Sequence, residues 1–206
     1  MGVLIFLDQA GGHIKKNSFE AASYGAKVAE NLGTSAFGIV LGKINDDLGA
    51  LGKYGLKKIF TSSDEKFNNF DDQLFTEAIA EAAKSSEAKV IIFSNNFNGK
   101  AIAPRLSVRL KAGLVTGALA LPETSNGFIV KKSVFSGKAF ANVSISTDVK
   151  IISLNPNAYQ VKEGEGTAEV GTLNLQPAEP KVKIKKVNNV SGEIPLSEAE
   201  LVVSGG

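Results

Sequence analysis

Short apolar runs alternate with stretches of helical periodicity from residue 3 to residue 121. Residues 3–7 form an unbroken apolar run, as in a strand buried on both faces, whereas residues 18–32 place small or apolar side chains at helical spacing. We predict strands at 3–7, 34–41, 57–61, 89–94 and 114–121, and helices at 18–32, 46–54, 71–84 and 100–111. Because strands that alternate with helices pair in parallel, the sequence predicts an α/β fold, with a mainly parallel twisted sheet and helices on both faces.

The pattern changes after Pro122, where three strand-like runs follow one another without a helix between them. The runs cover residues 128–134, 139–146 and 150–154, and polar or glycine-containing turns separate them. Strands that are joined by short turns pair antiparallel. We therefore expect antiparallel strands to follow the parallel part of the fold.

The carboxyl-terminal part of the chain differs in composition. Residues 155–180 are rich in Gly, Glu, Pro and Asn, which indicates a linker or a meandering arm. Residues 181–187 alternate apolar residues with lysine, which indicates a half-exposed strand rather than a polyanion site. We therefore predict one α/β domain over residues 1–155 and a linker or arm over residues 156–206.

The composition excludes several kinds of chemistry. The chain has no cysteine, which excludes disulfides and thiolate sites, and its single histidine, His13, leaves little for a metal site. Lysine and arginine (23) nearly cancel aspartate and glutamate (21), so the net charge of +2 gives no reason to expect nucleic acid as a partner. The first apolar run meets Asp8 at once, unlike a signal peptide, and no run has the length of a membrane span. We expect a cytoplasmic protein with no membrane insertion and no metal.

Residues 94–105 combine a strand end, a polar turn and a helix start, and the Asn-Gly-Lys sequence at 98–100 suggests a phosphate loop. A Walker A loop, however, has a glycine five positions before Gly99, where this chain has Ser94. It also has a magnesium-binding hydroxyl directly after the lysine, where this chain has Ala101. The turn lacks Walker A chemistry, and two interpretations stay open, a small-anion site or a contact with neighbouring protein.

Pro104 indicates where the following helix starts, because proline is tolerated in the first turn of a helix and disrupts its interior. We predict a start near Gly99, which would point free amides and Lys100 into the crevice at the strand ends. Arg105 and Arg109 are four residues apart on one helical face. Their guanidinium groups are suited to forked contacts with carboxylates of a partner.

The loop at residues 8–13 follows the first strand, where open α/β sheets bind ligands. Its two glycines do not match the fingerprint G-x-G-x-x-G, and Asp8 places a carboxylate where phosphate charge would have to be tolerated. His13 has no nucleophile at a recognisable spacing, so we assign it no catalytic role and predict a tight surface loop. Asn17 and Glu20 have the spacing of a capping box at the start of the first helix.

Several motifs together are similar to the amino-terminal domain of electron-transfer flavoprotein alpha subunits. They are Asn98-Gly99-Lys100, Ala103-Pro104-Arg105-Leu106, Gly113-Leu114-Val115-Thr116, Ser136-Gly137-Lys138-Ala139 and the ending at residues 196–206 with its double glycine. The resemblance covers nearly the whole chain, and the combination is much more specific than any one motif. It implies the adenine-nucleotide hydrolase-like form of the α/β fold.

The resemblance implies a heterodimer with a beta subunit and one FAD, held largely by a carboxyl-terminal domain of the alpha subunit. It implies electron transfer from acyl-CoA dehydrogenases of fatty acid β-oxidation, and from related dehydrogenases, to a quinone reductase or another acceptor. Gly205 and Gly206 would begin an incomplete FAD loop, since the chain stops there. We expect this chain alone to hold no cofactor and to be no enzyme. Members also carry an AMP, in the beta subunit.

Six residues at the sheet edge or in the family motifs are candidates for contact with the beta subunit or the rest of the alpha subunit. They are Asn98, Gly99, Lys100, Arg105, Gly137 and Lys138. Gly117 and residues 131–133 depart from the family pattern, which affects the same interface. The alternative function is a freestanding nucleotide-binding domain of universal-stress type, against which the poor fit of both glycine loops counts. An enzyme is the third reading, because no nucleophile and base pair supports it.

Overall fold

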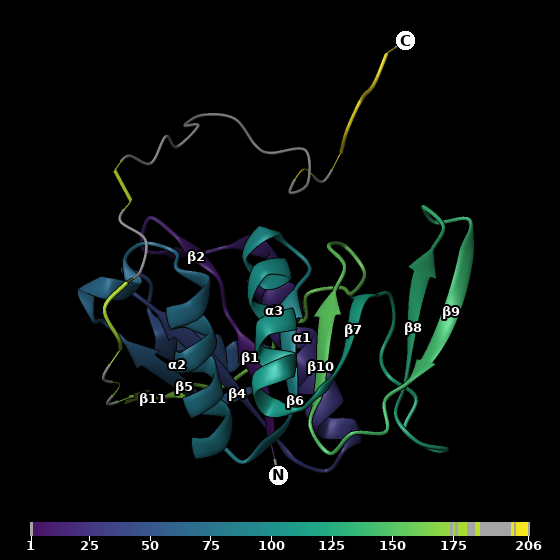
Figure 1. Cartoon of the computed structure of the whole chain (residues 1–206), viewed down its shortest axis with the longest axis horizontal. Coiled ribbons are helices and arrows are strands. Elements are labelled where there is room, and N and C mark those ends of the chain that lie inside the picture. Colours follow the sequence, from purple (N-terminus) through teal and green to yellow (C-terminus); the bar gives the residue numbers. More distant parts are fainter. Residues whose placement is uncertain are drawn as a thin grey trace.

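The computed structural model describes residues 2–173, 175, 177–180, 184, 185, 199 and 201–205 (Figure 1). Within them the strands are β1 (Gly2–Phe6), β2 (Gln9–Ala10), β3 (His13–Ile14), β4 (Ser35–Leu41), β5 (Leu56–Ser62), β6 (Ala88–Ser94), β7 (Gly113–Ala118), β8 (Ile129–Val134), β9 (Ala139–Ser144), β10 (Lys150–Leu154) and β11 (Glu169–Thr172). The helices are α1 (Lys16–Asn31), α2 (Asp72–Ser85) and α3 (Phe97–Leu110), with short 3-10 helices η1 (Leu48–Tyr54) and η2 (Glu65–Phe67). The strand predicted at 181–187 lies outside the described residues, except for Ile184 and Lys185.

One sheet organises the fold, and among the described residues its strand order is β11-β5-β4-β1-β6-β10-β7-β8-β9. The strands from β11 to β7 in this order are parallel, and β8 and β9 are antiparallel. The small β2–β3 ribbon forms a second, separate sheet. The predicted α/β class, with its mainly parallel sheet, is confirmed.

Helices cover both faces of the sheet because β1 is apolar at every position. Val3 and Ile5 point to the layer that holds α1, whereas Leu4 and Phe6 point to the layer that holds α2 and α3. Successive side chains of a strand point to opposite faces, so a central strand between two helical layers must be apolar throughout. Figure 1 shows α2 and α3 in front of the sheet and α1 behind it.

The pairing expected for residues 150–154 was wrong. The β8–β9 hairpin is antiparallel as predicted, but β10 lies between β6 and β7 and is parallel to both. Ile151 packs into the layer of α2 and α3 and Ile152 into the layer of α1, so both faces of β10 are buried. The lack of a helix between two predicted strands does not show that they pair with each other. An apolar strand buries more apolar surface in the centre of the sheet than at its edge, which stabilises the central position.

The helix α3 begins two residues before the predicted start near Gly99, so the predicted place of Pro104 in its first turn was wrong. The helix begins at Phe97, because the Asn96 side chain caps it by accepting a hydrogen bond from the Gly99 amide at 2.8 Å. Pro104 is therefore inside the helix rather than in its first turn. It lies on the exposed side, where water can satisfy the carbonyl that its missing N–H leaves free.

The predicted capping box of α1 is absent as well. The helix begins at Lys16 after Lys15, which makes no side-chain cap. Glu20, which is buried, instead accepts hydrogen bonds from the backbone amides of Asn157 at 3.0 Å and Tyr159 at 2.8 Å. Its carboxylate thereby attaches the beginning of the expected arm to α1.

Part of residues 156–206 continues the sheet. Strand β11 pairs in parallel with β5, and Ala168 before it is buried in the layer of α1 and η1. Tyr159 also packs there, with its ring at 5.6 Å from the ring of Tyr24. The domain boundary at residue 155 stays a prediction, but the sheet includes chain on both sides of it.

Candidate functional site

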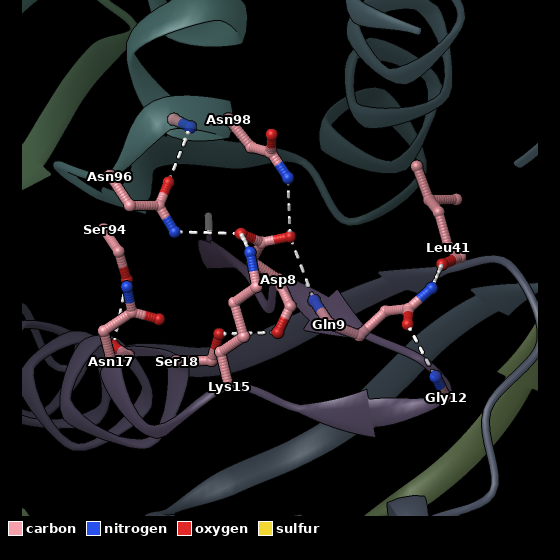
Figure 2. Close-up of polar contacts among 11 residues, drawn as sticks. Asp8, Gln9, Gly12, Lys15, Asn17, Ser18, Leu41, Ser94, Asn96 and Asn98 are labelled. Carbon is pink, nitrogen blue, oxygen red and sulfur yellow. Dashed lines mark hydrogen bonds and ion pairs between the residues drawn. The ribbon is translucent and has the colours of Figure 1, made fainter. Parts of the chain in front are cut away.

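The parallel topology brings two polar segments together at the carboxyl edge of the sheet. Strands β1 and β6 are neighbours, so the segment after β1 meets the turn after β6. That segment contains Asp8, and the turn contains Asn96 and Asn98 at the start of α3 (Figure 2). This is the edge at which open α/β sheets bind ligands.

The Asp8 carboxylate is the centre of this site, and the residue is only 3% exposed. Its oxygens accept hydrogen bonds from Lys15 Nζ at 2.9 Å, Asn96 Nδ2 at 2.9 Å, Asn98 Nδ2 at 2.9 Å and the Gln9 amide at 3.0 Å. The lysine also forms an ion pair with the carboxylate. A buried charge is stable only when such partners replace water, so the arrangement is a fully satisfied internal anion.

Hydroxyl groups attach the start of α1 to the same centre. Ser18 Oγ donates to the Asp8 carbonyl at 2.9 Å, and Ser94 Oγ donates to the Asn17 carbonyl at 2.9 Å. Figure 2 shows these contacts below the carboxylate. The Oδ1 atom of Asn17 is buried and accepts no hydrogen bond from the described residues. The site thus joins β1, β6, α1 and α3 through side chains.

Gln9 secures the loop beside this centre. Its side chain accepts from the Gly12 amide at 3.0 Å and donates to the Leu41 carbonyl at 3.2 Å (Figure 2). Gly12 has φ +87°, and a Cβ there would meet the Asn45 side chain at 2.5 Å. The tight loop predicted at residues 8–13 is therefore present as the β2–β3 ribbon, held against the end of β4.

His13 lies on the outside of that ribbon. Its Nδ1 is 2.7 Å from Asp46 Oδ1, and the other carboxylate oxygen accepts from the Ile14 amide at 2.7 Å. The Ile14 amide, and then the His13 ring, lower the pKa of the Asp46 carboxyl. The His13 side chain is 67% exposed, so this contact lies on the surface, where it secures a loop.

A phosphate does not fit this edge of the sheet. Asp8 occupies the position between the strand ends, and the Gly99 amide at the start of α3 already donates to Asn96. A Cβ at Gly99 would come within 2.0 Å of the Ser94 carbonyl oxygen, so this glycine is required by the close approach of α3 to β6. The Gly99 amide is thus already used and a carboxylate lies beside the helix start, an arrangement that disfavours a bound anion.

The residues described near the chain end do not form a flavin cradle either. Gly205 is exposed, and a Cβ built on it would meet nothing within 4 Å. Gly206, the other predicted FAD-loop residue, lies outside the described residues. Gly205 therefore has no neighbours among the described residues that would form a cradle for the pyrophosphate or the ring of FAD.

The structure divides the interface candidates near α3 into inward-facing and outward-facing residues. Asn98 donates to Asp8, and Gly99 is buried, so both are engaged within the domain. Lys100 is exposed. Arg105 is also exposed, but its guanidinium forms an ion pair with Asp72 of α2 at 2.7 Å. The sequence did not indicate this partner, because it depends on how α2 and α3 pack.

Gly137 and Lys138 lie elsewhere in the fold. Both are exposed in the tight loop between β8 and β9, where Gly137 has φ +85°. Figure 1 shows this hairpin at the edge of the sheet, separated from α3 by β10 and β7. The structure therefore does not gather the six candidates into one patch, and the role of each in subunit contact stays a prediction.

A groove of about 710 Å³ lies beside the start of α3. Its apolar lining comes from Phe70, Phe97, Ala101, Pro180 and Ile184. Its polar lining includes the carboxylates of Glu65, Asp71, Asp72 and Glu179. Asp71 caps α2 and Asp72 pairs with Arg105, so these carboxylates are engaged within the domain. The groove therefore combines apolar and charged side chains.

The described part of the chain has neither a cluster of metal-binding side chains nor a helix suited to span a membrane. No three histidine, cysteine, aspartate or glutamate residues there lie close enough to share a metal ion. None of the helices there combines the length and apolar character needed to cross a bilayer.

Sequence reasoning missed Asp8, Lys15 and Asn96 as one site. A signal was present, because a carboxylate follows one buried strand and three asparagines follow another. The sequence did not show that β1 and β6 are neighbours in the sheet. This pairing places the carboxylate and the amides within hydrogen-bond distance.

Comparison with known proteins gives a consistent family. A sequence profile of the family described as "Electron transfer flavoprotein domain" matches residues 3–178. The chain is 26% identical over 208 residues to "Electron transfer flavoprotein subunit alpha" of Syntrophomonas wolfei, covering 100% of this chain and 65% of that protein. It is 24% identical to the protein of the same name from Bacillus subtilis, covering 99% of this chain and 63% of the relative.

A relative with another name also matches the whole chain. The "Lactate dehydrogenase (NAD(+),ferredoxin) subunit LctC" of Acetobacterium woodii is 22% identical over all of this chain and 51% of its own length. The chain thus spans less than two thirds of the length of these relatives.

Proposed function

The chain belongs to the electron transfer flavoprotein family, and from this we propose that it is the amino-terminal α/β domain of an alpha-type subunit. In this role it is a scaffold and a subunit-contact domain for electron transfer rather than a catalyst. The observation that carries the proposal is the family match over residues 3–178 on a domain whose ligand edge is closed by its own carboxylate.

The structure of the site supports a scaffold role. The side chains at the carboxyl edge bind one another, and the Asp8 carboxylate is satisfied by donors from three segments. A site that binds substrate keeps polar groups available for it. Here the edge instead makes the β1, α1 and α3 segments rigid relative to one another.

The cofactor site is proposed to lie outside the described residues. We propose that the parent protein holds FAD in a part of the alpha subunit that lies beyond this domain, as the name flavoprotein of the relatives suggests. FAD would be the electron carrier when it is bound there. No residue described here is assigned to it, since neither the Asp8 centre nor Gly205 fits its pyrophosphate.

The partners follow from the same reasoning. We propose a beta-type subunit as the direct partner and a dehydrogenase as the electron donor of the assembled protein. Acyl-CoA dehydrogenases are one class of donor, and the name of the Acetobacterium woodii relative indicates lactate oxidation for that protein. A cytoplasmic location completes the proposal.

Association with the beta-type subunit tests the proposal directly. The chain and the beta-type subunit of the same organism should form a 1:1 complex in sedimentation velocity at micromolar concentrations. Two separate boundaries at all concentrations would contradict the subunit-contact role. Titration calorimetry with AMP and ATP examines the universal-stress alternative, which the occupied carboxyl edge disfavours.

A further inference from the structure

The sequence Asn-Gly occurs twice in the chain, and the fold places the two pairs in opposite environments. Asn98-Gly99 lies at the start of α3, and Asn126-Gly127 lies in the loop between β7 and β8. In an Asn-Gly pair the backbone nitrogen of the glycine can attack the asparagine side chain with little hindrance, because glycine has no Cβ to crowd the approach. The structure therefore decides which pair can react.

The loop that carries Asn126 is closed at its base and open at its tip. Glu123 and Ile129 exchange two backbone hydrogen bonds of 2.9 Å, which fix the two ends of the loop. Asn126 and Gly127 are exposed between them, and a Cβ built on Gly127 would meet nothing within 4 Å. Within the described part of the chain, neither the Asn126 side chain nor the Gly127 amide forms a hydrogen bond. Both reacting groups are thus free, and the loop has room for them to meet.

The fold holds the other pair apart. Asn98 Nδ2 donates to the Asp8 carboxylate at 2.9 Å, and the Gly99 amide donates to Asn96 Oδ1 at 2.8 Å. Gly99 is also buried, within the first turn of α3. Ring closure at Asn98 would turn its side chain back onto the Gly99 nitrogen, which breaks both hydrogen bonds and the capped helix start. The same dipeptide is therefore protected at α3.

We propose that Asn126 is a site of spontaneous deamidation, at which this domain gains a negative charge with time. The Gly127 nitrogen loses its proton and attacks Cγ of Asn126. An N–Cγ bond forms, the Cγ–Nδ2 bond breaks, and ammonia leaves with the proton. Water then adds to one of the two carbonyl carbons of the resulting succinimide, and the ring C–N bond at that carbon breaks. The product is aspartate or isoaspartate, so one water is consumed, one ammonia is released and nothing is oxidised or reduced.

The reaction changes the charge of the domain and leaves its core in place. A carboxylate replaces a neutral amide, so the formal net charge falls by one unit from +2. The new charge lies at the exposed tip of the loop, near Glu123, which accepts a hydrogen bond from Ser125 Oγ at 3.1 Å. The two hydrogen bonds at the base and the Phe128 side chain, which is 7% exposed, hold the rest of the loop. An exposed tip accommodates the longer backbone of isoaspartate.

Timed incubation of the purified chain in mildly alkaline buffer, followed by tryptic mapping, tests the proposal. Trypsin releases the two pairs in separate peptides, residues 90–100 and 112–131. Mass spectrometry detects the exchange of NH₂ for OH in each peptide, and an unincubated sample corrects for reaction during digestion. The matched control is the same chain incubated in urea, where both pairs have lost the protection of the fold. Asn126→Gln removes the reactive pair, because the longer side chain disfavours ring closure.

In the folded chain we expect Asn126 to deamidate at least about tenfold faster than Asn98, because Asn98 reacts only after local opening of its hydrogen bonds. In urea the two rates should become similar. The acidic form that wild type accumulates in isoelectric focusing should be missing from Asn126→Gln. Its formation in wild type should slow in mildly acidic buffer, where the attacking nitrogen keeps its proton. Equal rates at the two pairs in the folded chain, a faster rate at Asn98, or an Asn126 that stays intact would each overturn the proposal.

Discussion

Replacing Asp8 by alanine should destabilise this domain more than any other single change at the carboxyl edge. The carboxylate is 3% exposed and accepts four hydrogen bonds of 2.9–3.0 Å. Asp8→Ala leaves the Lys15 ammonium and the Asn96 and Asn98 amides without their acceptor. The lysine charge and the amide donors then lack a partner in a buried site, and leaving them unsatisfied costs free energy.

The magnitude follows from how well each donor can regain water. Breaking a buried ion pair by removing one partner costs about 3–5 kcal/mol. The Lys15 side chain is 26% exposed, so its ammonium recovers part of its hydration and the cost falls toward the lower limit. Asn96 and Asn98 are also partly exposed and can turn toward solvent. We therefore expect a loss of about 3 kcal/mol in the free energy of unfolding.

Urea unfolding followed by circular dichroism measures this loss. With a slope of about 3 kcal/mol/M, the midpoint should fall by about 1 M while the slope stays the same. Asp148→Ala is the matched control, because Asp148 also pairs with a lysine, Lys89, but is 76% exposed. Its midpoint should match the wild type. A midpoint for Asp8→Ala that also matches the wild type would refute the view that this carboxylate secures the edge.

Three further predictions concern other parts of the chain. Glu20→Ala should speed tryptic cleavage after Lys162 at least about tenfold, because it removes two charge-assisted hydrogen bonds of about 1.5 kcal/mol each. An unchanged cleavage rate, measured by mass spectrometry, would contradict this. Burial, and then Tyr159, raises the pKa of the Tyr24 hydroxyl above its ordinary 10.0. The free energy of unfolding should therefore fall above about pH 10, where the hydroxyl ionises in the unfolded chain but not in the folded one. Urea titrations at several pH values should show a smaller fall for Tyr24→Phe. The purified chain should be colourless and give no calorimetric signal with AMP at micromolar concentrations, whereas bound flavin in its absorbance spectrum or a micromolar Kd would show a nucleotide site.

The sequence alone was sufficient for the alternating elements and the fold class. The apolar run of β1 and the helical spacing of α1 are local patterns, and they indicate strand and helix whatever surrounds them. The motifs around Gly99 and Gly137 likewise indicated the family to which the chain belongs.

Only the tertiary structure decided which segments meet. The insertion of β10 between β6 and β7, the reach of Glu20 to the backbone at Asn157 and the pairing of Arg105 with Asp72 all join residues distant in sequence. Local periodicity shows which faces are apolar but not which surface covers them. The Asp8 site has the same origin: its carboxylate and amides become one site because parallel pairing of β1 with β6 brings their carboxyl ends to the same edge, where the buried charge can be satisfied.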